Sequence, residues 1–140
     1  MQATAKWIEG KQFLIETGSG ATIVVDGPVD HGGGGRGARP MELVLAGLAG
    51  CSSFDLMEIL QKSRQQVTDC RIEVAAKRAD AVPAVFTDIE LTFVITGVAV
   101  KQKQVERAVE LAVDKYCSVA TMLVAGGVKI SHSFQIIEQA

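Results

Sequence analysis

The feature that most constrains the fold is an apolar stretch that runs from Arg39 to Arg64, RPMELVLAGLAGCSSFDLMEILQKSR. Its spacing predicts one long helix. Pro40 would lie in the first turn, where a helix accepts proline because that backbone N–H has no intrahelical acceptor. Glu42 would place a negative charge in the same turn, at the positive end of the helix dipole. Residues from Leu43 to Cys51 are apolar or small on every face, which is typical of a buried core helix.

The second half of this helix is amphipathic, and the one cysteine of the stretch, Cys51, lies near its middle. Gly47 and Gly50 precede that cysteine on the helix, and each costs about 1 kcal/mol relative to alanine. We therefore expect the glycines to let a backbone or a substrate approach the sulfur. After Cys51 the apolar face is predicted to be Phe54, Met57 and Leu60, and the polar face Asp55, Glu58, Gln61 and Lys62.

The rest of the chain supplies strands and one further helix. Residues 30–37, DHGGGGRG, form a glycine-rich segment that we interpret as a flexible linker into the long helix. Within 86–96, Ile89, Leu91, Phe93 and Ile95 alternate with polar residues and should face one way. The predicted strands are 2–8, 12–17, 21–26, 70–80, 86–96 and 128–137, and an amphipathic helix is predicted at 101–116, with Val105, Val109, Ala112, Val113 and Tyr116 on its apolar face.

The element order βββ–α–ββ–α–β, with strands in antiparallel groups, predicts an α+β fold. A length of 140 residues fits a single domain spanning 1–140. The helix that is apolar all round needs more apolar surface than one such chain provides. We therefore expect a homodimer in which the two chains intertwine.

Charge and hydropathy limit the classes of binding partner and the cellular compartment that we expect for this protein. A net charge of −2 gives no reason to expect nucleic acid or an anionic membrane as a partner. No run approaches about 18 uninterrupted apolar residues, so no membrane-spanning helix is expected. The N-terminal residues lack the apolar region of a signal peptide, which favours the cytoplasm and reduced cysteines.

Cys51 and Cys117 are the strongest candidates for reactive residues, because a cysteine thiolate is a nucleophile. On a helix, Asp55 and Glu58 fall on the same side as Cys51, and both carboxylates would raise the pKa of its thiol. An activated Cys51 therefore needs a cation from elsewhere, and Arg36 and Arg39 are the nearest candidates in the sequence.

The alternative is that the cysteines are buried and inert, since free cysteine is among the most buried residue types. This alternative applies most strongly to Cys70, at the start of a predicted strand. His31 and His132 do not have metal-ligand spacing to the cysteines, so no metal or other cofactor is expected.

The motifs PMELVLAGLAGC and YCSVATML together resemble the OsmC/Ohr family along essentially the whole chain. The resemblance implies reduction of organic hydroperoxides in oxidative-stress defence, with Cys51 as the peroxidatic cysteine and Cys117 as the resolving cysteine. It also implies a Cys51–Cys117 disulfide during turnover and a dithiol reductant such as lipoyl groups. An obligate dimer with its sites at the interface is a further implication, as is an activating arginine from the glycine-rich region, either Arg36 or Arg39.

One position departs from the family pattern. Typical hydroperoxide reductases have glutamate directly after the proline, where this chain has Met41. Glu42 follows one residue later, and nine helical positions at about 100° each place it on the opposite side from Cys51. We keep Glu42 with Arg36 and Arg39 as a candidate catalytic residue. The PMEL motif together with C-S-x-x-D resembles the YhfA-like branch of the family.

Two classes of function remain open from the sequence. The first is a thiol peroxidase that acts through Cys51 and Cys117. The second is a binding or regulatory protein with an apolar pocket and little or no turnover. The residues expected to line that pocket are Met41, Leu48, Phe54 and Met122.

Overall fold

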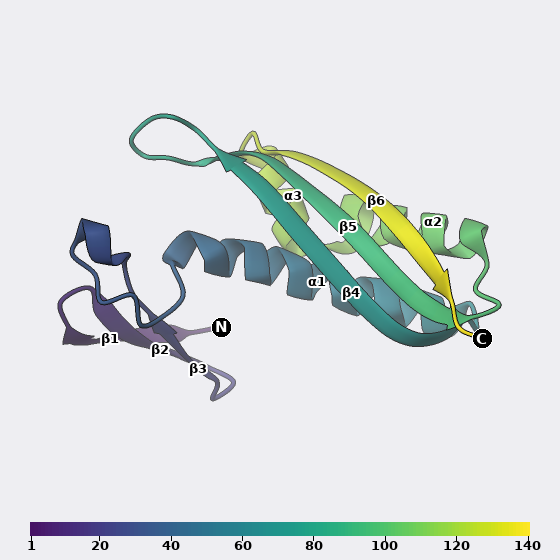
Figure 1. Ribbon diagram of the computed structural model, residues 1–140, viewed down its shortest axis with the longest axis horizontal. Helices are drawn as coiled ribbons and strands as arrows, with labels where there is room; N and C mark the ends of the chain where they lie inside the picture. Colours follow the sequence, from purple (N-terminus) through teal and green to yellow (C-terminus); the bar gives the residue numbers. More distant parts are fainter. The chain divides into compact units, whose positions relative to one another are not determined.

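Two three-stranded sheets and three α-helices make up the protein (Figure 1), and the computed structural model describes residues 1–140. By contacts the chain divides into two units, Met1–Ala46 and Gly47–Ala140. The elements are β1 (Ala3–Glu9), β2 (Gln12–Thr17), β3 (Thr22–Val25), a 3₁₀ turn (Val29–His31), α1 (Pro40–Lys62), β4 (Gln66–Arg78), β5 (Phe86–Val98), α2 (Gln102–Glu110), a π-helical turn (Leu111–Tyr116), α3 (Ser118–Ala125) and β6 (Lys129–Glu138).

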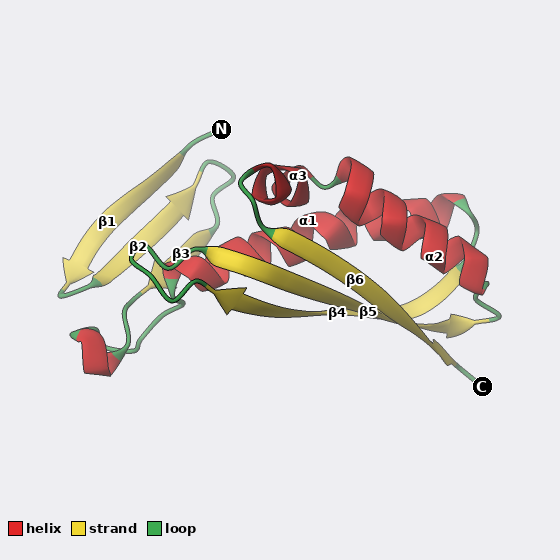
Figure 2. Ribbon diagram, turned by 90° about the horizontal axis from the view of Figure 1, so that it is seen from above, coloured by secondary structure: helices red, strands yellow, loops and turns green.

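The C-terminal unit is a sheet with its helices on one face (Figure 2). β4 and β5 form the predicted antiparallel hairpin, and β6 pairs with β5 in parallel. The expectation of purely antiparallel groups is therefore wrong for β6. A parallel neighbour requires a crossover connection, and α2, the π-helical turn and α3 provide it. The predicted inward face of β5 is confirmed, since Ile89, Leu91, Phe93 and Ile95 are all buried.

The crossover differs from the predicted single helix at 101–116. The α-helix ends at Glu110, and a wider π-helical turn follows as far as Tyr116. Tyr116 is 51% exposed, so its predicted place on the apolar face is wrong, because the π turn rotates the end of the segment. The other predicted members of the apolar face are buried: Val105, Val109, Ala112 and Val113.

The predicted long helix is confirmed as α1, with ends that follow local signals. The backbone N–H of Arg39 donates to the Glu42 carboxylate at 3.0 Å, which is one half of a capping box. At the other end, Arg64 adopts a left-handed conformation with φ 58°. The N–H of Gln65 then reaches back to the carbonyl of Leu60, as in a Schellman motif.

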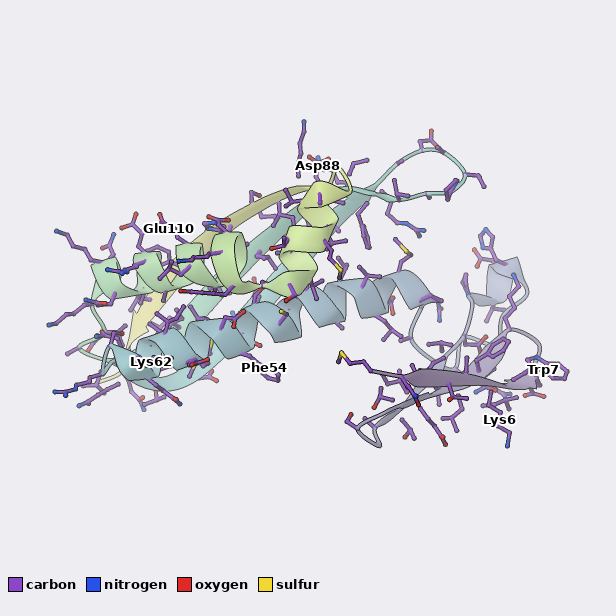
Figure 3. All side chains as sticks on the ribbon, turned by 180° about the vertical axis from the view of Figure 1, so that it is seen from behind. Lys6, Trp7, Phe54, Lys62, Asp88 and Glu110 are labelled. Atoms are coloured by element: carbon purple, nitrogen blue, oxygen red, sulfur yellow. The ribbon has the colours of Figure 1, made fainter.

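One stripe of α1 is buried, at four-residue spacing, and it shares only Leu60 with the predicted apolar face. Phe54, expected on the apolar inward face, is 81% exposed and projects from the helix surface (Figure 3). Within Leu43–Cys51 only Leu48 is buried, so the expectation of burial on every side is not met within this single chain. One layer of sheet and helix covers a single helical face, and the rest stays uncovered. The buried residues are Leu48, Ser52, Leu56 and Leu60.

By length and composition alone, α1 could cross a membrane: its most apolar 18-residue window has a mean hydropathy of 1.6. The sequence prediction of no membrane-spanning helix was based on uninterrupted apolar runs. That criterion is stricter than the mean hydropathy of a window. A core helix of a globular protein meets the same length and composition test. On one face of α1, Leu48, Leu56 and Leu60 are completely buried within the chain, as residues of a core helix are.

The N-terminal unit is the predicted antiparallel meander of β1, β2 and β3. It has almost no apolar core, because Val25 and Asp26 are its only buried residues. Trp7, on β1, is 62% exposed. A small sheet normally needs an apolar face packed on another layer to be stable. This unit therefore depends on packing that its own residues do not supply.

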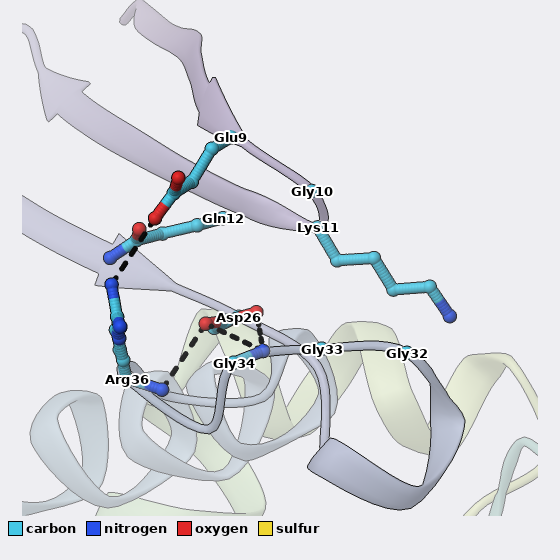
Figure 4. Close-up of a pocket in the computed structure, with 9 residues that line it drawn as sticks. All are labelled: Glu9, Gly10, Lys11, Gln12, Asp26, Gly32, Gly33, Gly34 and Arg36. Atoms are coloured by element: carbon cyan, nitrogen blue, oxygen red, sulfur yellow. Dashed lines mark hydrogen bonds and ion pairs between the residues drawn. The ribbon is translucent and has the colours of Figure 1, made fainter.

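The glycine-rich segment is organised around the carboxylate of Asp26 (Figure 4). The backbone N–H groups of Gly27, Gly34 and Arg36 donate to its two oxygens at 2.7–3.2 Å. A side chain on Gly33 would place its Cβ 2.0 Å from the Gly27 carbonyl oxygen, so only glycine fits there. Backbone hydrogen bonds to Asp26 thus order this segment. The sequence had led us to expect only a flexible linker.

Candidate functional site

Cys117 occupies the junction between the π-helical turn and α3. Its backbone N–H donates to the Ala112 carbonyl, which closes the π turn. The residue is the N-cap of α3, and its sulfur accepts a hydrogen bond from the backbone N–H of Ala120 at 3.4 Å. The buried hydroxyl of Ser52 donates to the same sulfur at 3.6 Å. Cys117 is completely buried, so this sulfur is held by two donors away from solvent.

Cys51 lies next to Ser52 on α1 and is partly exposed. Cys51 also lies close enough to Cys117 for its thiol to influence the Cys117 thiol. The fold therefore brings together two cysteines that are far apart in the sequence. The two cysteines differ in burial: Cys51 is a partly exposed residue, and Cys117 is buried.

The electrostatic environment distinguishes the cysteines further. Burial raises the pKa of the Cys117 thiol above its ordinary value of 9.0, and the interaction with the Cys51 sulfur acts in the same direction. The hydrogen bonds from Ala120 and Ser52 oppose this rise without cancelling it. Burial also raises the pKa of the Cys70 thiol, and the nearby Asp69 carboxylate adds to that effect. Both Cys70 and Cys117 are thus held as protonated thiols at neutral pH.

The predicted charged residues, Arg36, Arg39 and Glu42, make their hydrogen bonds within the N-terminal unit. The Arg36 guanidinium pairs with Glu9 at 3.2 Å on the exposed surface. The Arg39 guanidinium donates to the Gly37 carbonyl at 2.9 Å. Glu42 caps the start of α1 through the N–H of Arg39, so its carboxylate has a structural contact. Their catalytic roles stay predictions.

The four residues predicted to line an apolar pocket differ widely in their exposure to solvent. Leu48 is completely buried, whereas Phe54 and Met122 are 81% and 67% exposed, and Met41 is half-buried. An open cavity of about 360 Å³ lies beside the Cys51 helix and is lined by other residues. The pocket stays a prediction. The cavity-lining residues are Ala49, Gly50, Ser53, Met57, Cys70 and Ile72.

Two residues of functional interest were missed by reasoning from the sequence, Ser52 and Asp26. Both are polar and buried. A signal for Ser52 was present, because it follows Leu48 by four residues and precedes Leu56 by four, within a stripe that is otherwise apolar. Asp26 was identifiable only as an acidic residue at the end of a β-branched strand, ahead of the glycines.

Comparison with known proteins places these features in context. The family model described as OsmC-like protein matches residues 32–133. The chain is 44% identical over 137 residues to Protein YhfA of Escherichia coli strain K12, covering 98% of both chains.

Solved structures share the mixed α+β fold. A hypothetical protein from Aquifex aeolicus VF5 is 31% identical with a TM-score of 0.86, covering 99% of this chain and 97% of that one. An organic hydroperoxide resistance protein from Legionella pneumophila is 19% identical with a TM-score of 0.68, covering 96% of this chain and 97% of that one. The last likeness concerns the fold alone, at this level of identity.

Proposed function

This chain belongs to the OsmC-like protein family, as its two cysteine motifs predict, and from that premise we propose that it is a thiol peroxidase for organic hydroperoxides. The observation that carries the proposal is the proximity of the two cysteines in the C-terminal unit, because Cys51 adjoins Ser52, whose Oγ lies 3.6 Å from the Cys117 sulfur, and the Cys51 thiol influences that of Cys117. A peroxidatic cysteine must meet its substrate, and Cys51 is the more accessible of the two. The name of the Legionella pneumophila neighbour supplies the substrate class.

The proposed oxidation proceeds in two steps. The Cys51 thiolate attacks one peroxide oxygen, the O–O bond breaks, and the alkoxide leaves as an alcohol after it takes a proton. The product is a sulfenic acid on Cys51. The Cys117 sulfur then attacks the Cys51 sulfur, water leaves, and a disulfide joins the two. A dithiol such as a lipoyl group returns both cysteines to thiols, which fits a reducing cytoplasm.

Two further parts of the proposal concern the surroundings of the cysteines. We assign the cation that favours the Cys51 thiolate to Arg36 or Arg39, as the resemblance implies. We also propose that the working form is a homodimer with an interface above about 2,000 Å². The lack of an apolar core in the N-terminal unit and the exposed Phe54 support the dimer.

A binding or regulatory role is the second candidate, and one observation favours it. Met41 stands where hydroperoxide reductases of the family have glutamate, and the Glu42 carboxylate is engaged as a helix cap. A protein without an efficient activating group could bind apolar peroxides or other ligands without turnover.

The experiment measures consumption of an alkyl hydroperoxide with excess dithiol by the unaltered protein, Cys51→Ser and Cys70→Ser. We expect Cys51→Ser to abolish consumption and Cys70→Ser to retain it, because Cys51, unlike Cys70, lies close to Cys117. Cys70→Ser is the matched control, since Cys70 is also a partly exposed cysteine. Equal loss in both variants would exclude the peroxidatic role of Cys51, and no consumption by the unaltered protein would favour the binding role.

A further inference from the structure

Ser52 is a polar residue at a completely buried position of α1. Burying a hydroxyl in apolar surroundings is unfavourable unless it forms a hydrogen bond. Its neighbours on the buried stripe, Leu48 and Leu56, provide none. The partner of its Oγ is the Cys117 sulfur, at 3.6 Å. The serine is therefore placed to act on that sulfur.

A second donor acts on the same atom from a different element. The backbone N–H of Ala120, in the first turn of α3, donates to the Cys117 sulfur at 3.4 Å. A neutral thiol is only a weak acceptor, whereas hydrogen bonds to a charged acceptor are roughly twice as strong as neutral ones. Two donors that converge on one buried sulfur thus suit a sulfur that carries negative charge at some stage.

The difference in burial between the two cysteines indicates when the Cys117 sulfur becomes negatively charged. Cys117 is completely buried, whereas Cys51 is partly exposed. This difference in burial favours attack by an external thiolate on the Cys51 side of a Cys51–Cys117 disulfide. In thiol–disulfide exchange the sulfur that is not attacked departs as a thiolate.

We propose that the reductant attacks Cys51 in the oxidised protein, and that Ser52 is a positioning residue that stabilises the departing Cys117 thiolate. This inference rests on the proposed function, because it describes how the same pair is regenerated.

The exchange balances as follows for a dithiol reductant. One thiolate of the dithiol forms an S–S bond with Cys51, the Cys51–Cys117 bond breaks, and its electron pair stays on the Cys117 sulfur. The second thiol loses its proton and attacks the reductant's own sulfur, which releases Cys51 as a thiolate and the dithiol as a cyclic disulfide. The raised pKa of Cys117 then favours return of a proton to its sulfur.

The first test identifies the attacked sulfur. The protein is oxidised with diamide, so that the disulfide forms without any hydroperoxide, and is then exposed briefly to 2-mercaptoethanol. After an acid quench and alkylation of free thiols, peptide mass spectrometry locates the mixed disulfide. We expect the adduct on Cys51 and an alkylated Cys117. An adduct on Cys117 would overturn the inference.

The second test isolates the role of the Ser52 hydroxyl. Ser52→Ala should slow reduction of the disulfide by dithiothreitol about tenfold, the effect of one hydrogen bond to a charged group. It should leave the rate at which hydroperoxide oxidises Cys51 unchanged, and Ser52→Thr should restore the reduction rate. Ser53→Ala is the matched control, because the adjacent hydroxyl donates to the Gly50 carbonyl at 2.8 Å instead.

The outcomes separate this inference from the proposed function. Unchanged reduction in Ser52→Ala, or equal slowing of both half-reactions, would contradict the positioning role. If hydroperoxide fails to oxidise Cys51 but the diamide-formed disulfide is attacked as described, the peroxidase proposal fails and the exchange mechanism stands. Failure to form a disulfide by either route would overturn the inference itself.

Discussion

Replacing Phe54 by alanine tests whether a second copy of the chain covers the exposed surface of α1. The side chain is 81% exposed in the single chain (Figure 3). If no partner covers it, the substitution should change the free energy of unfolding by less than about 0.5 kcal/mol, as is usual for surface positions.

A homodimer that buries Phe54 predicts a much larger effect. An aromatic side chain buries about 150–250 Å², and apolar burial contributes about 25 cal/mol per Å². Burial of the exposed part of Phe54 would then contribute about 3 kcal/mol or more per copy. Two copies meet in each dimer, so Phe54→Ala should weaken association by about 6 kcal/mol, or roughly 10⁴-fold.

Sedimentation equilibrium at micromolar concentration measures this association directly. Val82→Ala is the control, since it shortens a fully exposed apolar side chain in the loop between β4 and β5. We expect dimers for the unaltered protein and the control, and monomers for Phe54→Ala. A stable folded monomer of the unaltered protein, or a Phe54→Ala dimer of unchanged affinity, would refute the reasoning.

Three further predictions concern the glycine-rich segment and the thiols. Gly33→Ala should lower the melting temperature, because its Cβ would lie 2.0 Å from a backbone oxygen and overpacking costs about 1–3 kcal/mol; an unchanged melting temperature would contradict the close packing. Despite the opposing effect of burial, three backbone hydrogen bonds hold the pKa of the Asp26 carboxyl below its ordinary value of 3.8. The unfolded chain therefore binds the proton more readily, so this stabilisation is complete above about pH 4 and is lost as pH falls through the lower folded pKa. Acid unfolding followed by circular dichroism should be less steep in Asp26→Asn, and an identical pH dependence would exclude this role. Iodoacetamide at neutral pH should modify Cys51 before Cys70 and Cys117, whose pKa values are raised, and peptide mass spectrometry that finds Cys70 modified first would contradict this order.

Local patterns in the sequence determined most of the secondary structure. The start of α1 follows from Pro40 and the capping Glu42, since both act within one helical turn. The buried face of β5 follows from strict alternation, because successive side chains of a strand point to opposite faces. Cys51 and Cys117 were identifiable through the motifs around them, and the family assignment followed from the same residues.

Only the tertiary structure decided which face of α1 is buried. The stretch around Cys51 is apolar in several directions, so its pattern did not distinguish the stripe that contains Ser52 from the side of Phe54. The parallel pairing of β6 was likewise undetermined, because alternation in a strand carries no information on the direction of its neighbour.

The environment of the two sulfurs also belongs to the tertiary structure. The hydroxyl of Ser52 on α1 and the N–H of Ala120 on α3 meet at the Cys117 sulfur, and the π turn holds the backbone of Cys117 through the Ala112 carbonyl. Similarly, Asp26 gathers N–H groups up to ten residues away. Such hydrogen bonds depend on which segments the fold brings together, and local composition and periodicity do not predict this. The sequence by itself therefore specified most of the elements and the candidate cysteines, and long-range packing specified the contacts that give those cysteines different surroundings.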